Sequence, residues 1–181
     1  MGKIRHGRKK KRGRCTLRNA QRLNTEEPAE IKNAPHSFVF YRGVTVDSVE
    51  RLSKDFRKVM EPFTASALQA SKANRIRDFL SVSGVLHVSH MCIFSCSDCI
   101  TTLKIGRVPR GPTLYLKIIN YSLAKDVKSS LKKQLEFDEQ FQHPPLVILN
   151  NFGGGEAHKK IMASMFQNMF PPLNLTKVCK N

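Results

Sequence analysis

The amino-acid sequence predicts an α/β (α+β) fold, in which a mixed sheet with flanking helices is preceded by a disordered basic tail. Short runs rich in β-branched and aromatic residues are interleaved with segments whose apolar residues recur at three- and four-residue steps. Positive charge is concentrated at the start of the chain, which separates a tail and linker, residues 1–33, from a folded domain, residues 34–181. With 40% apolar residues and 11 Phe, the domain can build a core.

The first segment of the chain is dominated by basic residues. Ten of the 31 Lys and Arg residues fall within positions 1–22, which contain no Asp or Glu. Such a block repels itself and cannot bury apolar surface, so we expect it to stay disordered until a polyanion neutralises it. The run "GRKKKRGR" suits nuclear import, phosphate binding or both, and a purely solubilising tail is the alternative. The strongest candidates for RNA phosphate contacts are Lys9, Lys10, Lys11, Arg12 and Arg14.

The domain is expected to begin with a strand and an amphipathic helix. The segment "HSFVFYRG" at 36–43 is rich in β-forming residues and stops at a glycine. From 46 to 60 the apolar residues recur with a helical period, and Asp47 followed by Glu50 suggests a capping pair at the start. The basic residues of this helix, Arg57 among them, fall mainly off the apolar stripe, and we interpret them as a solvated face.

A second helix, three strands and a third helix are predicted next. Residues 66–80 place apolar side chains at helical spacing. Three segments have the composition of strands, namely "VLHVSHMCIF" (85–94), "TTLKIGRV" (101–108) and "PTLYLKII" (112–119), and the turn "PRGP" joins the last two. The segment 122–135 begins with a serine that can cap a helix.

The last predicted elements are a strand and a helix. The segment "PLVILNNF" at 145–152 is a continuous apolar run, which is typical of a strand covered on both faces. From 161 to 170, Met and Phe residues form two rows, which predicts a buried helix that ends before Pro171. No apolar run approaches the roughly 20 residues that a membrane span needs, so we expect no membrane association.

Three cysteines raise the question of a metal site. Cys92, Cys96 and Cys99 stand in the order C-x-x-x-C-x-x-C, so their thiolates are candidate ligands of an iron–sulfur cluster. His87 and His90 lie just upstream, which makes zinc a second alternative. However, Cys92 falls inside a predicted strand, and no fourth zinc ligand of suitable spacing follows. We therefore interpret the cysteines as small, half-buried side chains, and we predict no metal and no cofactor.

Two further groups of basic residues are candidates for RNA phosphate contacts. Arg107 and Arg110 lie beside the "PRGP" turn, where a backbone amide and a guanidinium can approach a phosphate together. Lys159 and Lys160 follow the glycine-rich loop "NNFGGGEAHKK" at 150–160, which leads from a predicted strand into a helix. That loop lacks the endings of a P-loop and of a dinucleotide-binding fold.

The sequence offers no arrangement that suggests catalysis. No serine–histidine–aspartate, cysteine–histidine or paired-carboxylate pattern stands out, and the acidic residues are scattered over predicted helices. We therefore predict a protein that is not an enzyme, that has no catalytic residue and that takes no small-molecule substrate.

Six ordered segments resemble a known family. They are "APHSFVFYRG" (34–43), "DFRKVMEPFTASAL" (55–68), "GRVPRGPTLYLKI" (106–118), "YSLAKDV" (121–127), "HPPLVILNNF" (143–152) and "MASMFQNMFPPLNL" (162–175). Together they resemble the Brix-domain family, and within it the Peter Pan (Ssf-type) branch, over about residues 34–179. The cysteine triplet is not part of that pattern, which favours incidental cysteines.

The resemblance implies a function and a partner class. It implies a nucleolar assembly factor of the large ribosomal subunit, which binds precursor ribosomal RNA and other assembly factors and catalyses nothing. One of those factors would wrap the domain with extended segments. A complete domain of this kind has two similar halves, so we expect this chain to hold the N-terminal half, as a fragment or a truncated form. The alternatives are a protein scaffold whose tail serves only import, and a metal protein that uses the three cysteines.

Overall fold

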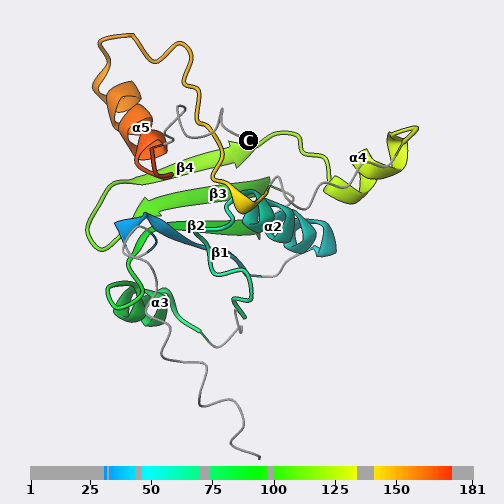
Figure 1. The fold of residues 1–181 in the computed structure, drawn as a ribbon, viewed down its shortest axis with the longest axis horizontal. Coiled ribbons are helices and arrows are strands. Elements are labelled where there is room, and N and C mark those ends of the chain that lie inside the picture. The colour runs from blue at the N-terminus through cyan, green and yellow to red at the C-terminus, as the bar shows by residue number, and fades with distance from the viewer. Residues whose placement is uncertain are drawn as a thin grey trace, which may run out of the picture.

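A computed structural model describes residues 31, 33–43, 46–69, 74–97, 100–133 and 141–172. Four strands form one sheet, and helices lie on both of its faces (Figure 1). The strands are β1 (His36–Arg42), β2 (Val88–Ser97), β3 (Ile100–Arg107) and β4 (Thr113–Ile118). The helices are α2 (Asp47–Val59), α3 (Ile76–Ser83), α4 (Ala124–Ser130) and α5 (Ala157–Gln167).

The sheet is mixed, as the sequence predicts. Its strand order is β1-β2-β3-β4, with β1 parallel to β2 and the two later pairs antiparallel. The parallel pair requires a crossover, and α2 and α3 lie in the chain between its two strands. The predicted α+β class is therefore confirmed. None of the described helices combines the length and the apolar character that crossing a bilayer requires.

Alternating side chains of the strands build a separate core on each face of the sheet. On one face, Cys92 and Phe94 pack with Ile105 beneath α2 and α5, and Met165 of α5 joins this cluster. On the other face, Phe40 packs with Phe79 of α3, and the two rings stack with their centroids 4.4 Å apart. Each such buried ring stabilises the fold by about 2–3 kcal/mol relative to exposure. Both faces of β2 are therefore covered.

Helix α2 confirms the predicted amphipathic segment but not its predicted cap. The helix begins at Asp47, so Val46 occupies the N-cap position and makes no side-chain capping bond. Asp47 and Glu50 lie in the first turn, where negative charge is favoured by the helix dipole. The Glu50 carboxylate instead pairs with the Lys54 ammonium at 2.8 Å. The capping pair was wrong because the helix starts one residue earlier than an aspartate cap requires.

Arg57 is a structural link and not part of a solvated face. Its guanidinium donates to the carbonyl of Val39 in β1 at 2.7 and 3.2 Å, and to the carbonyls of Ser66 and Leu68 at 3.2 Å each. Burial lowers its pKa, yet an arginine stays charged at neutral pH. One cation thus joins α2, the first strand and the segment that follows α2. The sequence interpretation failed because the guanidinium reaches past the apolar stripe to backbone acceptors.

Two predicted helices are shorter in the structure. Residues 66–69 are not helical, since the carbonyls of Ser66 and Leu68 accept from Arg57, and α3 begins only at Ile76. The helix predicted over 122–135 extends only over α4, and its N-cap is Leu123 and not the serine. The Asp55 carboxylate of α2 accepts from the first amide of α4 at 2.9 Å. A cap from another helix, invisible to local sequence reasoning, replaces the predicted one.

The apolar segment 145–152 is not a strand. It joins no described ladder, and the side chains of Leu146 and Ile148 are 61% and 81% exposed. An apolar run of this kind forms a buried strand only when it pairs with a sheet edge and is covered on both faces, and this segment pairs with neither edge strand of the described sheet. The predicted buried helix is confirmed as α5, in which Met165 is buried and Met169 follows just beyond the end, although Ile161 is half exposed.

Candidate nucleic-acid interface

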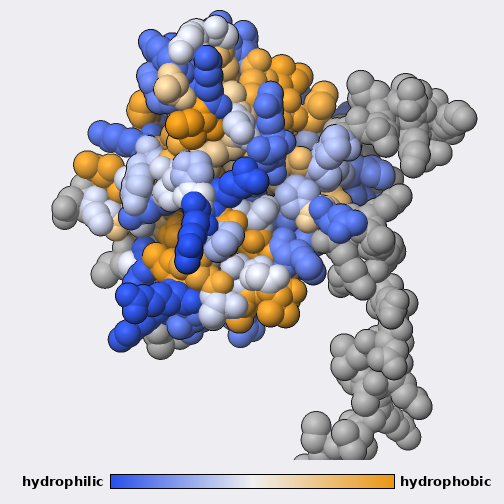
Figure 2. All heavy atoms as spheres, turned by 90° about the vertical axis from the view of Figure 1, so that its left-hand side faces the viewer, coloured by the Kyte–Doolittle hydropathy of each residue, from blue (hydrophilic) through white to orange (hydrophobic). Residues whose placement is uncertain are grey.

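One end of the sheet gathers polar and basic residues from separate parts of the chain. The starts of β1 and β2 lie there beside the end of β3, and the turn between β3 and β4 closes the same end (Figure 1). Within the sheet register, His90 of β2 stands opposite Arg107 of β3. Figure 2 faces this side of the molecule and shows hydrophilic side chains interleaved with apolar patches.

The turn after β3 holds Arg107 and Arg110 at the surface. Both residues are exposed, and the turn closes with a hydrogen bond from the Gly111 amide to the Arg107 carbonyl at 3.0 Å. A side chain at Gly111 would place its Cβ 2.4 Å from the Cβ of Arg107, so only glycine fits. The predicted "PRGP" turn is thus present, and it keeps two guanidinium groups close in sequence at one corner of the sheet.

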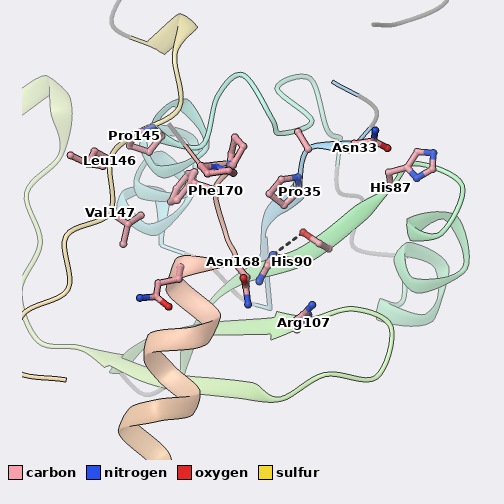
Figure 3. Close-up of a pocket in the computed structure, with 15 residues that line it drawn as sticks. Asn33, Pro35, His87, His90, Arg107, Pro145, Leu146, Val147, Asn168 and Phe170 are labelled. Atoms are coloured by element: carbon pink, nitrogen blue, oxygen red, sulfur yellow. Dashed lines mark hydrogen bonds between the residues drawn. The ribbon is translucent and has the colours of Figure 1, made fainter. Parts of the chain in front are cut away.

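A cavity of about 750 Å³ opens beside this turn. It lies between the starts of β1 and β2, the end of β3, the segment after α5 and the apolar segment 145–147 (Figure 3). Arg107 and His90 lie on one side of it, and Asn168, just past α5, lies near them (Figure 3). Its apolar wall comes from Phe170 and from prolines at 35, 145, 171 and 172. The volume falls within the range of roughly 300–1,000 Å³ that is typical of ligand sites.

His90 is the most unusual side chain of this cavity. The residue is only 1% exposed, and its Nδ1 lies 2.8 Å from the Ser89 hydroxyl. Its Nε2 is buried and has no hydrogen-bond partner among the described residues. Burial, and secondarily the positive charge of Arg107, lower the pKa of His90 to about 4, so the ring is neutral at pH 7. A buried acceptor or donor without a partner is costly and calls for an explanation.

The second basic group lies away from this cavity. Lys159 and Lys160 are on the first turn of α5, whereas the cavity is lined by Gln167 at the other end of this helix, eight residues or about 12 Å away at 1.5 Å per residue. Glu156 occupies the N-cap of α5, and its carboxylate pairs with Lys159 and with His158 at 3.1 Å each. An anion of the protein itself therefore already sits where a phosphate would bind.

The cysteines that the structure describes do not converge. Cys92 and Cys96 are four residues apart on β2, about 13 Å at 3.3 Å per residue, whereas a zinc–sulfur bond is about 2.3 Å. Burial raises the pKa of the Cys92 thiol to about 12, which disfavours the thiolate that a metal needs. These two side chains pack within the core. Cys99, like the tail residues at 9–14, lies outside the described residues.

Sequence reasoning identified the arginine turn and missed the cavity beside it. The sequence indicates His90 only as a candidate zinc ligand. Its burial depends on residues 145–147 and on the residues past α5, which are more than 50 positions away in the chain. No local pattern around "HVSHM" at 87–91 indicates that distant residues bury His90. The neighbouring Ser89 is the one signal, because a hydroxyl next to a buried histidine can fix its tautomer.

Comparison with known proteins places the chain in a family. The family model described as the Brix domain matches residues 43–180. The chain belongs to the Brix-domain family. This Brix-domain match includes the arginine turn, α5 and both lysines at its start, whereas the basic tail and the whole of β1 precede it. The resemblance inferred from the six segments is therefore confirmed.

Individual relatives also match most of this chain, at identities between 38% and 51%. Protein Peter pan of Drosophila melanogaster is 51% identical over 156 residues, which cover 86% of this chain and 34% of that protein. Suppressor of SWI4 1 homolog of Homo sapiens is 45% identical over 180 residues, 99% of this chain and 36% of that protein. Ribosome biogenesis protein SSF1 of Saccharomyces cerevisiae is 38% identical over 170 residues, 85% of this chain and 37% of that protein. The chain spans about a third of the length of these relatives.

Proposed function

We propose that this chain acts in assembly of the large ribosomal subunit, in the nucleolus, as a non-enzymatic factor that binds precursor ribosomal RNA and other assembly factors. The observation that carries the proposal is membership of the Brix-domain family together with relatives named ribosome biogenesis proteins. The net charge of +17 supports a polyanionic partner. The run of basic residues at 7–14 supports entry into the nucleus.

The three groups of basic residues contribute differently to RNA binding in this proposal. The tail provides dense charge, which gives affinity without sequence readout because it acts on phosphates. Arg107 and Arg110 lie on a closed turn at the end of a sheet, so they can fix the position of the backbone of a bound RNA. Lys159 and Lys160 contribute less in this account, because Glu156 already pairs with the first of them.

Exposed apolar residues support a protein partner as well. Ile119, just after β4, is 84% exposed, and Ile148 is 81% exposed. Strand β4 lies at one edge of the described sheet, where extended segments of another chain can pair or pack. These features suit an assembly factor whose extended segments wrap the domain. The same features also favour the second candidate function, a protein scaffold whose tail serves only nuclear import.

Changing the arginine turn tests the RNA-binding proposal. The double variant Arg107→Gln/Arg110→Gln should bind single-stranded RNA more weakly, with a salt dependence shallower by about 1.4 in log–log slope, because each lost phosphate contact accounts for about 0.7. Fluorescence anisotropy of a labelled RNA at several salt concentrations measures both. The matched control, Lys125→Gln/Lys132→Gln, removes two exposed charges in and just past α4. Equal slopes for the two double variants would exclude a specific role of the turn.

A further inference from the structure

One face of the sheet is covered only over β1 and β2. On the face beneath α2 and α5, β3 and β4 contribute apolar side chains to the core. On the opposite face, the buried strand residues that pack with α3 all come from β1 and β2. In Figure 1, α3 lies beside β1, on the opposite side of the sheet from β4. The side chains that β3 and β4 direct to this second face form an open sheet face, which consists of Thr102, Lys104, Thr113, Tyr115 and Lys117.

The charge of the open sheet face is positive. In the sheet register, Lys104 of β3 stands beside Tyr115 of β4. The next row crosses all four strands and consists of Arg42, Ser95, Thr102 and Lys117. The four strands contain no Asp or Glu, and within the described part of the chain Arg42, Lys104 and Lys117 make no ion pair. At about 4.8 Å per strand the row is about 14 Å long, and its complement is an extended polyanion.

Tyr115 adds an aromatic ring to this positive surface. Its side chain is 71% exposed, although the residue lies in the middle of a strand. The Lys104 ammonium lies 5.2 Å from the centroid of the ring, which is a cation–π distance. An accessible ring can stack on a nucleobase, and a cation beside that ring can bind the phosphate of the same nucleotide. Arg107 shares the face of Ile105 by the alternation of β3, so the open sheet face is separate from the arginine turn.

We propose that the open sheet face binds single-stranded RNA, with one unpaired base stacked on the Tyr115 ring and the neighbouring phosphates on Lys104 and Lys117. The inference rests on the proposed RNA-binding function and adds to it a surface and a preference for unpaired RNA. The bases of a duplex are stacked on one another, so they offer no free face to Tyr115. An acidic peptide fits the lysines equally well, but it gives the exposed ring no planar partner.

A fluorescent reporter at Tyr115 provides the first test. The chain contains no tryptophan, so Tyr115→Trp introduces a single indole that can still stack on a base. Its fluorescence should be quenched when a single-stranded oligouridylate of about 12 nucleotides binds. Tyr121→Trp is the matched control, because Tyr121 is also exposed but contacts Ser48 of α2 and lies outside the open sheet face. Equal quenching of the two variants, or quenching of neither, would contradict the proposal.

Two further substitutions of Tyr115 measure what the ring contributes to affinity. Tyr115→Thr removes the ring and keeps a residue that favours strands, whereas Tyr115→Phe keeps the ring. On oligouridylate, Tyr115→Thr should bind about tenfold more weakly and Tyr115→Phe like the original chain. An abasic strand of the same length carries the phosphates without the bases, so all three proteins should bind it equally. An equal loss on both strands would show a structural role only and overturn the inference.

The outcomes separate this inference from the proposed function. If Tyr115→Thr binds both strands like the original chain, no base stacks on the open sheet face, while phosphate binding by the tail and the arginine turn stands. If oligoglutamate changes the fluorescence of Tyr115→Trp and RNA does not, the surface binds an acidic protein segment and the inference is overturned. If the unaltered chain binds neither strand at low salt, the proposed RNA-binding function itself fails.

Discussion

Replacing Lys9, Lys10, Lys11, Arg12 and Arg14 together with glutamine should weaken RNA binding by orders of magnitude at low salt and make the remaining binding much less sensitive to salt. Each cation that neutralises a phosphate of single-stranded RNA releases counterions and adds about 0.7 to the slope of log affinity against log salt concentration. Five lost contacts should therefore reduce that slope by about 3.5. Titrations of a labelled precursor RNA fragment between low and physiological salt measure both changes.

A variant that keeps the charge of the tail is the matched control. Exchanging each of the five lysines and arginines for the other basic residue retains the charge, and the salt dependence should stay that of the original chain. A glutamine variant that shows the original slope would remove the tail from the RNA-binding mechanism. Import would then be its remaining role.

The free energy of unfolding should fall by up to ~3 kcal/mol between pH 7 and pH 4 because of His90 alone. Its pKa is lowered from 6.5 to about 4 in the folded chain, by burial first and by Arg107 second. Between these values the unfolded chain binds a proton that the folded chain does not, so acid favours unfolding. The contribution is fully present above pH 6.5 and is lost as pH falls toward 4.

Urea melts at several pH values measure this contribution. His90→Gln removes the titrating group, so the difference in unfolding free energy between the two proteins should change across pH 6.5 to 4 and stay constant above it. Comparison with the variant also cancels other groups, such as Glu50, whose pKa is lowered by Lys54 and which loses its stabilising effect only at lower pH. A pH-independent difference would show that His90 titrates normally and is not held neutral by burial.

Much of the fold could be predicted because its strands and helices carry local signals. Alternation along β4 places Leu114, Leu116 and Ile118 on one face, and the structure confirms that face as part of the core. The helical spacing of the apolar residues in α2 likewise allowed that helix to be predicted. The helix predicted over 66–80 is confirmed only from Ile76 onward, and in the non-helical segment before it the carbonyls of Ser66 and Leu68 accept hydrogen bonds from Arg57.

The failed strand at 145–152 shows a second limit of sequence reasoning. Apolar composition indicates burial, yet Leu146 and Ile148 are exposed among the described residues. An apolar segment pairs with a sheet only where an edge strand is accessible to it and other elements bury its faces. Both conditions depend on the tertiary structure and not on the sequence of the segment.

The candidate interface was predictable only where one turn forms it. Arg107 and Arg110 share a turn that proline and glycine specify locally, so their proximity follows from the sequence. The cavity assembles from five separate segments, and the Ser89 hydroxyl that contacts His90 also contacts the His36 carbonyl of a neighbouring strand. Such a site appears only once the tertiary packing is known.

Ultraviolet crosslinking of the tagged chain in cells, with sequencing of the attached RNA and mapping of the crosslinked peptides, tests the central claim most directly. Our account predicts discrete peaks in precursor RNA of the large ribosomal subunit, and peptides from the basic tail or from the segment around Arg107. An absence of RNA above background would contradict RNA binding and favour a protein scaffold whose tail serves only import.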